Sequence, residues 1–175
     1  ISLISRVGKD FPEPFLDMLS AKGADLRAVE RAAGKTMRYH STFNSDYSQR
    51  TSDLTELNVL KDFNPVLSND VRRARFVYLG TLPPSTQLSV LEQFNDPKLV
   101  VIDTIEYFID HSKQDLLKVL SKVNGIVIND HEAKLLANGN IIACGKKILG
   151  CGPDFCVIKK GEHGSVLFHS DGSVT

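Results

Sequence analysis

The sequence predicts an α/β fold with a mostly parallel, helix-covered sheet and a small, separate β-sheet flap. Between residues 76 and 158, four short apolar runs rich in β-branched residues alternate with helical patterns. Strands that alternate with helices in this way are typical of βαβ units and a parallel sheet. Earlier in the chain, residues 35–60 are rich in Thr, Tyr, Ser, Phe and Val and have no helical period, which indicates strands of another kind.

The amino-terminal segment predicts a strand followed by a helix. Ile1 stands in an apolar run without the basic region of a signal peptide, so we interpret it as a cut end that enters a strand. Residues 11–22 are expected to form a helix, because Pro12 and Pro14 suit its first turn and Gly23 suits the position after its end.

Residues 35–60 are predicted to form two strands of a small sheet, with a turn at 44–46. The polar side chains interleaved in this segment include Arg38, His40, Arg50 and Glu56. The segment is too polar for core strands, so we expect a surface flap with one solvated face. We therefore predict a division in which 1–34 and 61–175 form an α/β core and 35–60 forms the flap.

The second half of the chain predicts the strands and helices of the parallel sheet in order. The expected strands are 76–79, 99–102, 126–128 and 155–158. The expected helices are 85–94, 112–122 and 130–149, the last broken near Asn138-Gly139. We expect helices on both faces of the sheet, as in most parallel sheets. The segments 165–168 and 173–175 flank Asp171-Gly172 and resemble a hairpin cut off at its second strand.

The composition excludes several classes of protein. Hydrophobic residues make up 42% of the chain, too many for a disordered segment. The 21 basic and 21 acidic residues leave no net charge, which argues against a nucleic-acid partner because such proteins need a basic face. No apolar run approaches the ~20 residues that span a bilayer, so no membrane partner is expected. Cys144, Cys151 and Cys156 form no C-x-x-C pair, and we interpret them as reduced, mostly buried thiols of a cytoplasmic protein.

Polar residues or glycines follow each of the four predicted parallel strands. Gly80 follows the first, Asp103 the second and Asn129 the third, while the segment 159–164 (KKGEHG) follows the fourth. Ligands of open α/β sheets bind beyond the carboxyl ends of the strands, so we expect these groups to share one edge. Lysines and free backbone N–H groups suit phosphate, and Glu132 suits a hydrated Mg²⁺ ion. Each residue also has a simpler interpretation: Asn129 or Asp130 as the cap of the next helix, Asp103 as the cap of a short helical turn, and the glycines as turns.

Four segments carry a resemblance to a known family. In order along the chain they are Val7-Gly8-Lys9-Asp10, Lys22-Gly23-Ala24-Asp25, Asn129-x-x-Glu132 and the G-x-x-G turn within 157–164. Together they resemble the motifs of the ribokinase-like carbohydrate kinases, the family of B-type phosphofructokinase, over nearly all of the chain. The resemblance implies a Rossmann-like, ribokinase-type sheet and places a β lid at 35–60. Two positions depart from the family pattern: Thr104-Ile105 follows Asp103 where many members have Pro-Asn, and Lys159 stands where Thr is common.

The resemblance implies an ATP-dependent sugar or nucleoside kinase that transfers the γ-phosphoryl group to a hydroxymethyl group. The implied cofactors are ATP and Mg²⁺. The residues assigned to cofactor binding are Asn129, Glu132, Lys159, Gly161, Glu162 and Gly164, with Glu132 also as the metal ligand. Our candidates for contact with the substrate are Arg38 and Glu56 in the lid, and Asp103. Lids of this kind also serve as dimer surfaces in the family, so a homodimer through the lid is the protein partner that the resemblance suggests.

Two family motifs are missing from the sequence. The catalytic base of the family is the Asp of a Gly-Ala-Gly-Asp segment, and no such segment occurs here. The Gly-Gly-Asn sugar-binding segment is absent too. We therefore interpret the chain as the middle of a longer kinase and expect no kinase activity from it alone. Two alternatives stay open: a non-catalytic nucleotide- or sugar-binding protein of the same fold, and an α/β domain of unrelated function such as a methyltransferase.

Overall fold

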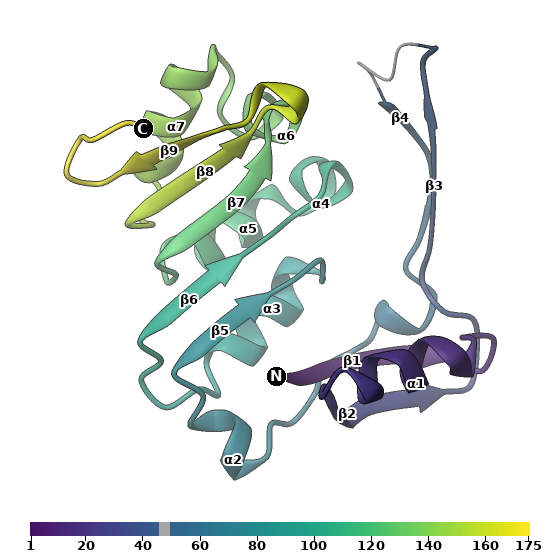
Figure 1. The fold of residues 1–175 in the computed structure, drawn as a ribbon. Coiled ribbons are helices and arrows are strands. Elements are labelled where there is room, and N and C mark those ends of the chain that lie inside the picture. Colours follow the sequence, from purple (N-terminus) through teal and green to yellow (C-terminus); the bar gives the residue numbers. More distant parts are fainter. Residues whose placement is uncertain (46–49) are drawn as a thin grey trace. The chain divides into compact units, whose positions relative to one another are not determined.

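The computed structural model describes residues 1–45 and 50–175, and the chain divides into two compact units, Ile1–Pro65 and Val66–Thr175. Each unit has its own sheets (Figure 1). The predicted lid, 35–60, lies inside the first unit. The grouping of 1–34 with 61–175 in a single core stays a prediction.

The first unit begins with two parallel strands joined by a helix. β1 (Ser2–Gly8) pairs with β2 (Asp25–Ala32), and α1 (Glu13–Ala21) connects them. Parallel strands need such a crossover, and α1 provides it. The predicted helix at 11–22 is therefore confirmed, with Pro12 as the residue before its first turn. β2 was not predicted.

A two-stranded antiparallel ribbon follows within the same unit. β3 (Arg38–Phe43) pairs with β4 (Arg50–Glu56), and the register shifts by a bulge after His40. The two predicted strands of the lid are thus confirmed, whereas the predicted turn reaches Asp46, outside the described residues. The ribbon has no buried side chain among the residues whose exposure is described. A short 3₁₀ helix, Asn58–Leu60, follows it.

The second unit is built on a five-stranded sheet with neighbours in the order β5-β6-β7-β8-β9. The strands are β5 (Phe76–Leu79), β6 (Leu99–Ile102), β7 (Gly125–Asn129), β8 (Phe155–Lys159) and β9 (Ser165–His169). The first four run parallel, and β9 returns antiparallel to β8. This arrangement confirms the four predicted parallel strands and the first strand of the predicted hairpin. Its second strand is reduced to a single bridge between Phe168 and Val174.

One short helix precedes β5, and the other helices occupy the connections between these strands. The helices are α2 (Asn69–Arg72), α3 (Pro84–Leu91), α4 (Glu106–His111), α5 (Lys113–Leu120), α6 (Asp130–Ala137) and α7 (Ile141–Leu149), with a 3₁₀ turn at Gly161–His163. The predicted helices at 85–94 and 112–122 are confirmed within a few residues. The predicted break between two helices is confirmed as well, because Asn138 and Gly139 have φ angles of 48° and 143°. The short helices α2 and α4 were not predicted.

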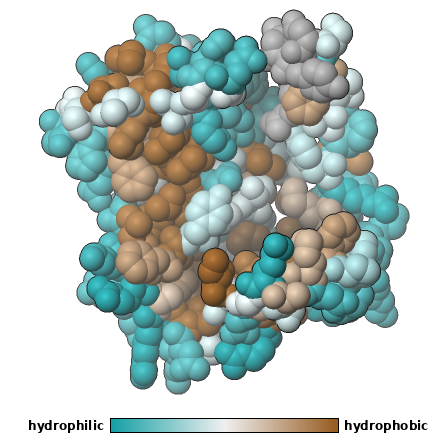
Figure 2. Space-filling model, in the orientation of Figure 1, coloured by the Kyte–Doolittle hydropathy of each residue, from teal (hydrophilic) through white to brown (hydrophobic). Residues whose placement is uncertain are grey.

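Within residues 66–175, helices cover one face of the sheet, so our expectation of helices on both faces was wrong for this unit (Figure 1). The physical reason is the strand order. β5 to β8 are consecutive neighbours, and right-handed crossovers between consecutive neighbours place every helix on the same side. The strands alternate accordingly: Val77 and Leu79 are buried, whereas Phe76 and Tyr78 are 65% and 62% exposed. Figure 2 shows apolar residues gathered on the uncovered face.

The core of this unit lies between the sheet and its helices. Its fully buried members include Ile102, Phe108, Leu116, Leu120, Ile126, Ile128, Ile148 and Ile158. The three cysteines are unpaired, as predicted, with Cys144 and Cys156 buried and Cys151 half-buried. Burial, and to a smaller extent the neighbouring Cys144, raises the pKa of the Cys156 thiol to about 12. In the described part of the chain no helix has the length and hydropathy needed to cross a membrane.

Candidate functional site

The carboxyl ends of the four parallel strands bring most of the predicted site residues to one edge of the sheet. Asn129 ends β7 and Lys159 ends β8, and the two are register partners across the sheet. Asp103 directly follows β6, and its N–H donates to the Leu79 carbonyl of β5 at 3.1 Å. The predicted convergence of polar groups at this edge is therefore present in the second unit, as the parallel topology requires.

Asn129 and Glu132 bond to each other through the first turn of α6. The Asn129 side chain accepts the Glu132 N–H at 2.8 Å, and Glu132 Oε2 accepts the Asn129 N–H at 2.9 Å. This reciprocal pair is a capping box, which satisfies two backbone donors at a helix start. The simpler interpretation of Asn129, as a cap, is therefore what these contacts show. The capping box also orders both residues at the sheet edge, with Glu132 only 5% exposed.

The segment after β8 forms a tight glycine-rich loop. Lys159 is exposed at the end of the strand, and the Lys160 N–H donates to the Gly164 carbonyl at 2.7 Å across the loop. Gly161 and Gly164 have φ angles of 57° and 78°, a region that side chains other than glycine rarely adopt. Glu162 is exposed and its Oε1 lies 3.6 Å from His163 Nε2. A loop of this kind, beside an exposed lysine, suits an anionic ligand.

The ends of β5 and β6 carry a cluster that sequence reasoning missed. The Tyr78 hydroxyl donates to Asp103 Oδ2 at 2.8 Å. Gln87 of α3 is 1% exposed, and its Nε2 donates to the carbonyls of Gly80 and Asp103 at 2.9 and 3.1 Å. Partial burial, then the hydrogen bond and charge of Asp103, raise the pKa of Tyr78 to about 12. Asp103 is therefore held by its backbone and by its carboxylate.

The donor set fits a nucleotide-borne Mg²⁺ ion better than one held by protein groups alone. Within the described residues, no three His, Cys, Asp or Glu side chains gather as a metal site. Mg²⁺ keeps several waters and is usually bound through one or two carboxylates together with substrate phosphates. Glu132, held in the capping box with Asn129, would provide one such carboxylate.

In the first unit, the Val7-Gly8-Lys9-Asp10 segment ties the end of β1 to the start of the ribbon. The Thr36 N–H and hydroxyl donate to Asp10 Oδ1 at 2.7 and 2.8 Å, and the Gly8 N–H donates to Thr36 Oγ1 at 2.9 Å. A Cβ added at Gly8 would lie 2.4 Å from the Thr36 nitrogen, so the approach requires glycine. The bonds from Thr36, the backbone one first, hold the pKa of Asp10 below its ordinary value.

The two lid candidates lie at the base of the ribbon. Arg38 and Glu56 are cross-strand register partners, and Arg38 Nη2 is 4.0 Å from Asp10 Oδ2. The structure thus brings these two predicted residues together. Asp103 belongs to the second unit, so a substrate site shared by all three stays a prediction.

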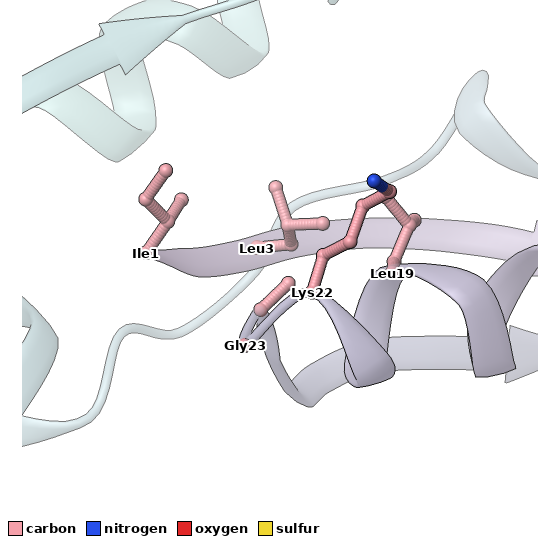
Figure 3. Close-up of a pocket in the computed structure, with 6 residues that line it drawn as sticks. Ile1, Leu3, Leu19, Lys22 and Gly23 are labelled. Carbon is pink, nitrogen blue, oxygen red and sulfur yellow. The ribbon is translucent and has the colours of Figure 1, made fainter.

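Two cavities of the first unit lie away from the predicted residues. One of about 280 Å³, between β1 and the end of α1, is lined by Ile1, Leu3, Leu19, Lys22, Gly23 and Ala24 (Figure 3). The other, of about 390 Å³, is lined by Arg6, Ala32, Ala33, Gly34, Lys35, Asn58, Val59 and Asp62. The first is mostly apolar, with Lys22 as its charged side chain, and therefore offers little to orient a phosphate or a sugar.

Comparison with known families gives a match over the entire chain. A family profile described as pfkB family carbohydrate kinase matches residues 1–175. A curated relative, the cytidine kinase of Thermococcus kodakarensis, is 26% identical over 177 residues, which cover 99% of this chain and 62% of the relative. The chain thus spans less than two thirds of the length of that relative.

Solved structures show the same fold at low sequence identity. The nucleoside kinase of Methanocaldococcus jannaschii, described as an archaeal member of the ribokinase family, matches with a TM-score of 0.70 and 21% identity, over 99% of this chain and 56% of that one. Arabidopsis thaliana ribokinase, complexed with ribose and ATP, matches with a TM-score of 0.72 and 18% identity, over 99% of this chain and 59% of that one.

Proposed function

The chain belongs to the pfkB family of carbohydrate kinases, and we propose that it carries the nucleotide site and part of the acceptor site of an ATP-dependent sugar or nucleoside kinase. Membership in a kinase family implies ATP as the phosphate donor and removes the unrelated α/β domain as an alternative. The observation that carries the proposal is the sheet edge at which Asn129 and Lys159 are register partners beside a glycine-rich loop.

We assign the polyphosphate of ATP to the end of β8. Lys159 supplies a positive charge there, and Gly161 and Gly164 let the backbone approach an anion closely. Asn129 is the register partner of Lys159, and Glu132, joined to Asn129 by the capping box, would hold an Mg²⁺ ion carried by the nucleotide. When bound, Mg²⁺ neutralises charge on the transferring phosphoryl group. Glu162, exposed on the loop, is the remaining residue of the proposed nucleotide site.

We propose Asp103 as a contact for the acceptor in the second unit, and we keep Arg38 and Glu56 of the lid as separate candidates in the first unit. Carboxylates accept hydrogen bonds from hydroxyl groups, which suits a sugar or the ribose of a nucleoside. A closing lid would exclude water, which otherwise competes as the phosphoryl acceptor. The names of two relatives, a cytidine kinase and a nucleoside kinase, favour a nucleoside as the acceptor.

These 175 residues contain no Gly-Ala-Gly-Asp segment, so we propose that they bind nucleotide without transferring phosphate. The second candidate is a non-catalytic nucleotide- or sugar-binding protein of the same fold, and the presence or loss of Gly-Ala-Gly-Asp in the complete protein would discriminate the two. A coupled assay for acceptor-dependent ADP release tests whether the 175-residue chain transfers phosphate, and we expect no release. A cytoplasmic location and a homodimer through the lid stay predictions.

Substitutions that keep the capping box test the nucleotide site. Asn129→Asp retains an N-cap oxygen but places a negative charge beside the polyphosphate, and Glu132→Gln keeps the bond to the Asn129 N–H without the carboxylate charge. We expect calorimetry to show Mg-ATP binding about tenfold weaker for Asn129→Asp, with unchanged thermal stability. Glu132→Gln should weaken Mg-ATP binding more than binding of ATP in EDTA.

Lys159→Met and the matched control Lys146→Met complete the test. Lys146 is an exposed lysine in the last turn of α7 and lies outside the proposed site. Loss of the Lys159 charge should weaken Mg-ATP binding about tenfold, whereas Lys146→Met should bind as the unsubstituted chain does. Equal affinities for the Lys159 and Lys146 variants would refute the assignment of the polyphosphate to β8.

A further inference from the structure

Gln87 joins three backbone carbonyls at the ends of two strands. It lies on α3, and its Nε2 is 2.9 Å from the Gly80 carbonyl, 3.1 Å from the Asp103 carbonyl and 3.4 Å from the Leu79 carbonyl. The side chain is 1% exposed, so water competes little for these bonds. One amide group therefore fixes the point where β5 and β6 end.

This arrangement has a cost in unsatisfied polar atoms. Among the described residues, Gln87 Oε1 is buried without a hydrogen-bond partner, and so is Thr104 Oγ1, next to Asp103 in the chain. Burying a polar atom without a partner is unfavourable, and an apolar residue of similar size would avoid that cost at position 87. An apolar residue would, however, leave the strand-end carbonyls without the amide donor. The orientation of Gln87 thus provides a donor to the strand-end carbonyls and leaves its own Oε1 without a hydrogen-bond partner.

The strand ends that Gln87 joins determine where Asp103 stands. The Asp103 N–H bonds to Leu79, its carbonyl accepts from Gln87, and its carboxylate accepts from Tyr78. Tyr78 thereby occupies one carboxylate oxygen and orients the side chain from the strand next to β6. Backbone and side chain of Asp103 are constrained from separate directions.

We propose that Gln87 is a positioning residue that fixes Asp103 at the sheet edge for contact with an acceptor bearing hydroxyl or amino donors. Gln87 itself is buried beneath the edge and acts through Asp103. The inference rests on the proposed function in one respect, the role of Asp103 in acceptor binding. The clamp that Gln87 makes on the strand ends can be measured without any ligand.

The test compares Gln87→Met with a matched glutamine, Gln93→Met. Gln93 follows the end of α3, and its amide also bonds to backbone groups, those of Leu67 and Ser89, away from the strand ends. Hydrogen exchange of the Asp103 amide, followed by NMR in the 175-residue chain, reports the clamp directly. Calorimetric titrations with cytidine and with ribose measure acceptor affinity, and a titration with Mg-ATP measures nucleotide affinity. Asp103→Asn serves as the reference for loss of acceptor binding.

We expect Gln87→Met to speed exchange of the Asp103 amide at least tenfold. The exchange rate of the Ile128 amide, in the centre of the core, should stay within threefold of its rate in the unsubstituted chain. Acceptor affinity should fall about as far as in Asp103→Asn, with Mg-ATP affinity unchanged. Gln93→Met should change neither the Asp103 exchange nor the acceptor affinity, even where its thermal stability falls equally.

Unchanged exchange of the Asp103 amide in Gln87→Met overturns the inference whatever binds. Faster exchange with undiminished acceptor affinity also overturns it, because Asp103 would then be displaced without consequence for the ligand. If the unsubstituted chain binds neither cytidine nor ribose while exchange still responds to Gln87→Met alone, the clamp is supported and the acceptor role in the proposed function is rejected.

Discussion

The ribbon of β3 and β4 and the five-stranded sheet of β5 to β9 use short strands in opposite ways. Every strand of the sheet buries side chains, and Ile102, Ile126 and Ile128 are fully inaccessible. The ribbon buries no side chain of described exposure, and polar groups join its strands: Tyr39 bonds to Ser52 at 3.0 Å and Thr42 to Asp53 at 2.6 Å. Exposed hydrogen bonds of this kind contribute little to the free energy of unfolding, so the pairing of β3 with β4 is only marginally stable.

The largest expected difference between the two sheets comes from truncating one apolar side chain to alanine in each of them. Ile128→Ala in β7 should lower the free energy of unfolding by about 2–5 kcal/mol, because it opens a cavity in a closed core. Leu54→Ala in β4, where the side chain is 43% exposed, should change it by no more than about 0.5 kcal/mol. Urea denaturation followed by circular dichroism measures both. Equal losses would show that the ribbon is as firmly packed as the sheet.

Adding a methyl group to α7, at its contact with the sheet, tests the same contrast. A Cβ at Gly145 of α7 would lie 2.5 Å from the ring of Phe168 in β9, which is 1% exposed and has little room to move. Gly145→Ala should therefore cost about 1–3 kcal/mol, despite the better helix propensity of alanine. The measurement is again urea denaturation. Combining it with Phe168→Leu should recover part of the loss, and strictly additive effects would contradict the predicted overlap.

The polar edge of the sheet should give an intermediate effect, because its hydrogen bonds are half-buried. Asn129→Ala removes the N-cap of α6 and should cost about 1 kcal/mol, measured by thermal denaturation. Asn129→Asp keeps the cap and should remain close to the unsubstituted chain. If both variants are equally destabilised, then the side-chain bond to the Glu132 N–H is not what stabilises the start of α6.

The smallest effect is expected at the base of the ribbon and depends on pH. The pKa of Asp10 is lowered in the folded chain, chiefly by the Thr36 N–H, so its contribution is present above its ordinary value of 3.8 and is lost as pH falls through the folded value. Thermal denaturation between pH 6 and pH 2.5 should therefore show the curve of Asp10→Asn converging on that of the unsubstituted chain in acid. Asp17→Asn, in α1, controls for a lost surface charge. If the stability curve of Asp10→Asn stays parallel to that of the unsubstituted chain at every pH, then the Asp10 carboxylate does not stabilise the base of the ribbon.

The sequence predicted the second unit well because its strands are apolar, short and separated by helical patterns. β2 was missed because Asp25–Ala32 (DLRAVERA) is rich in charged residues and helix formers. It becomes a strand through its pairing with β1, from Ser2 opposite Asp25 to Gly8 opposite Ala32, which local propensity does not encode. Helices on both faces were wrongly expected because periodicity gives no strand order, and the order decides the face.

The candidate site was likewise predicted in one part and missed in another. The register of Asn129 and Lys159 follows from parallel strands, so a sequence that predicts the strands also predicts that edge. Tyr78 and Gln87 were missed because one lies in an apolar strand and the other in a helix. A signal existed for Gln87: it stands three residues after Pro84 and three before Val90, on the buried side of α3. A polar residue at that spacing indicates a buried hydrogen-bonding role.

The different burial of the three cysteines allows alkylation to report the opening of the core of the second unit. Because burial raises the pKa of Cys156 to about 12, the reactive thiolate is scarce at neutral pH, even before access is considered. Cys144 of α7 is equally inaccessible, whereas Cys151 is partly open to solvent. An alkylating reagent should therefore modify Cys151 first and the other two only when α7 separates from the sheet. The delay between the two modifications measures how often the core opens under conditions in which the chain remains folded.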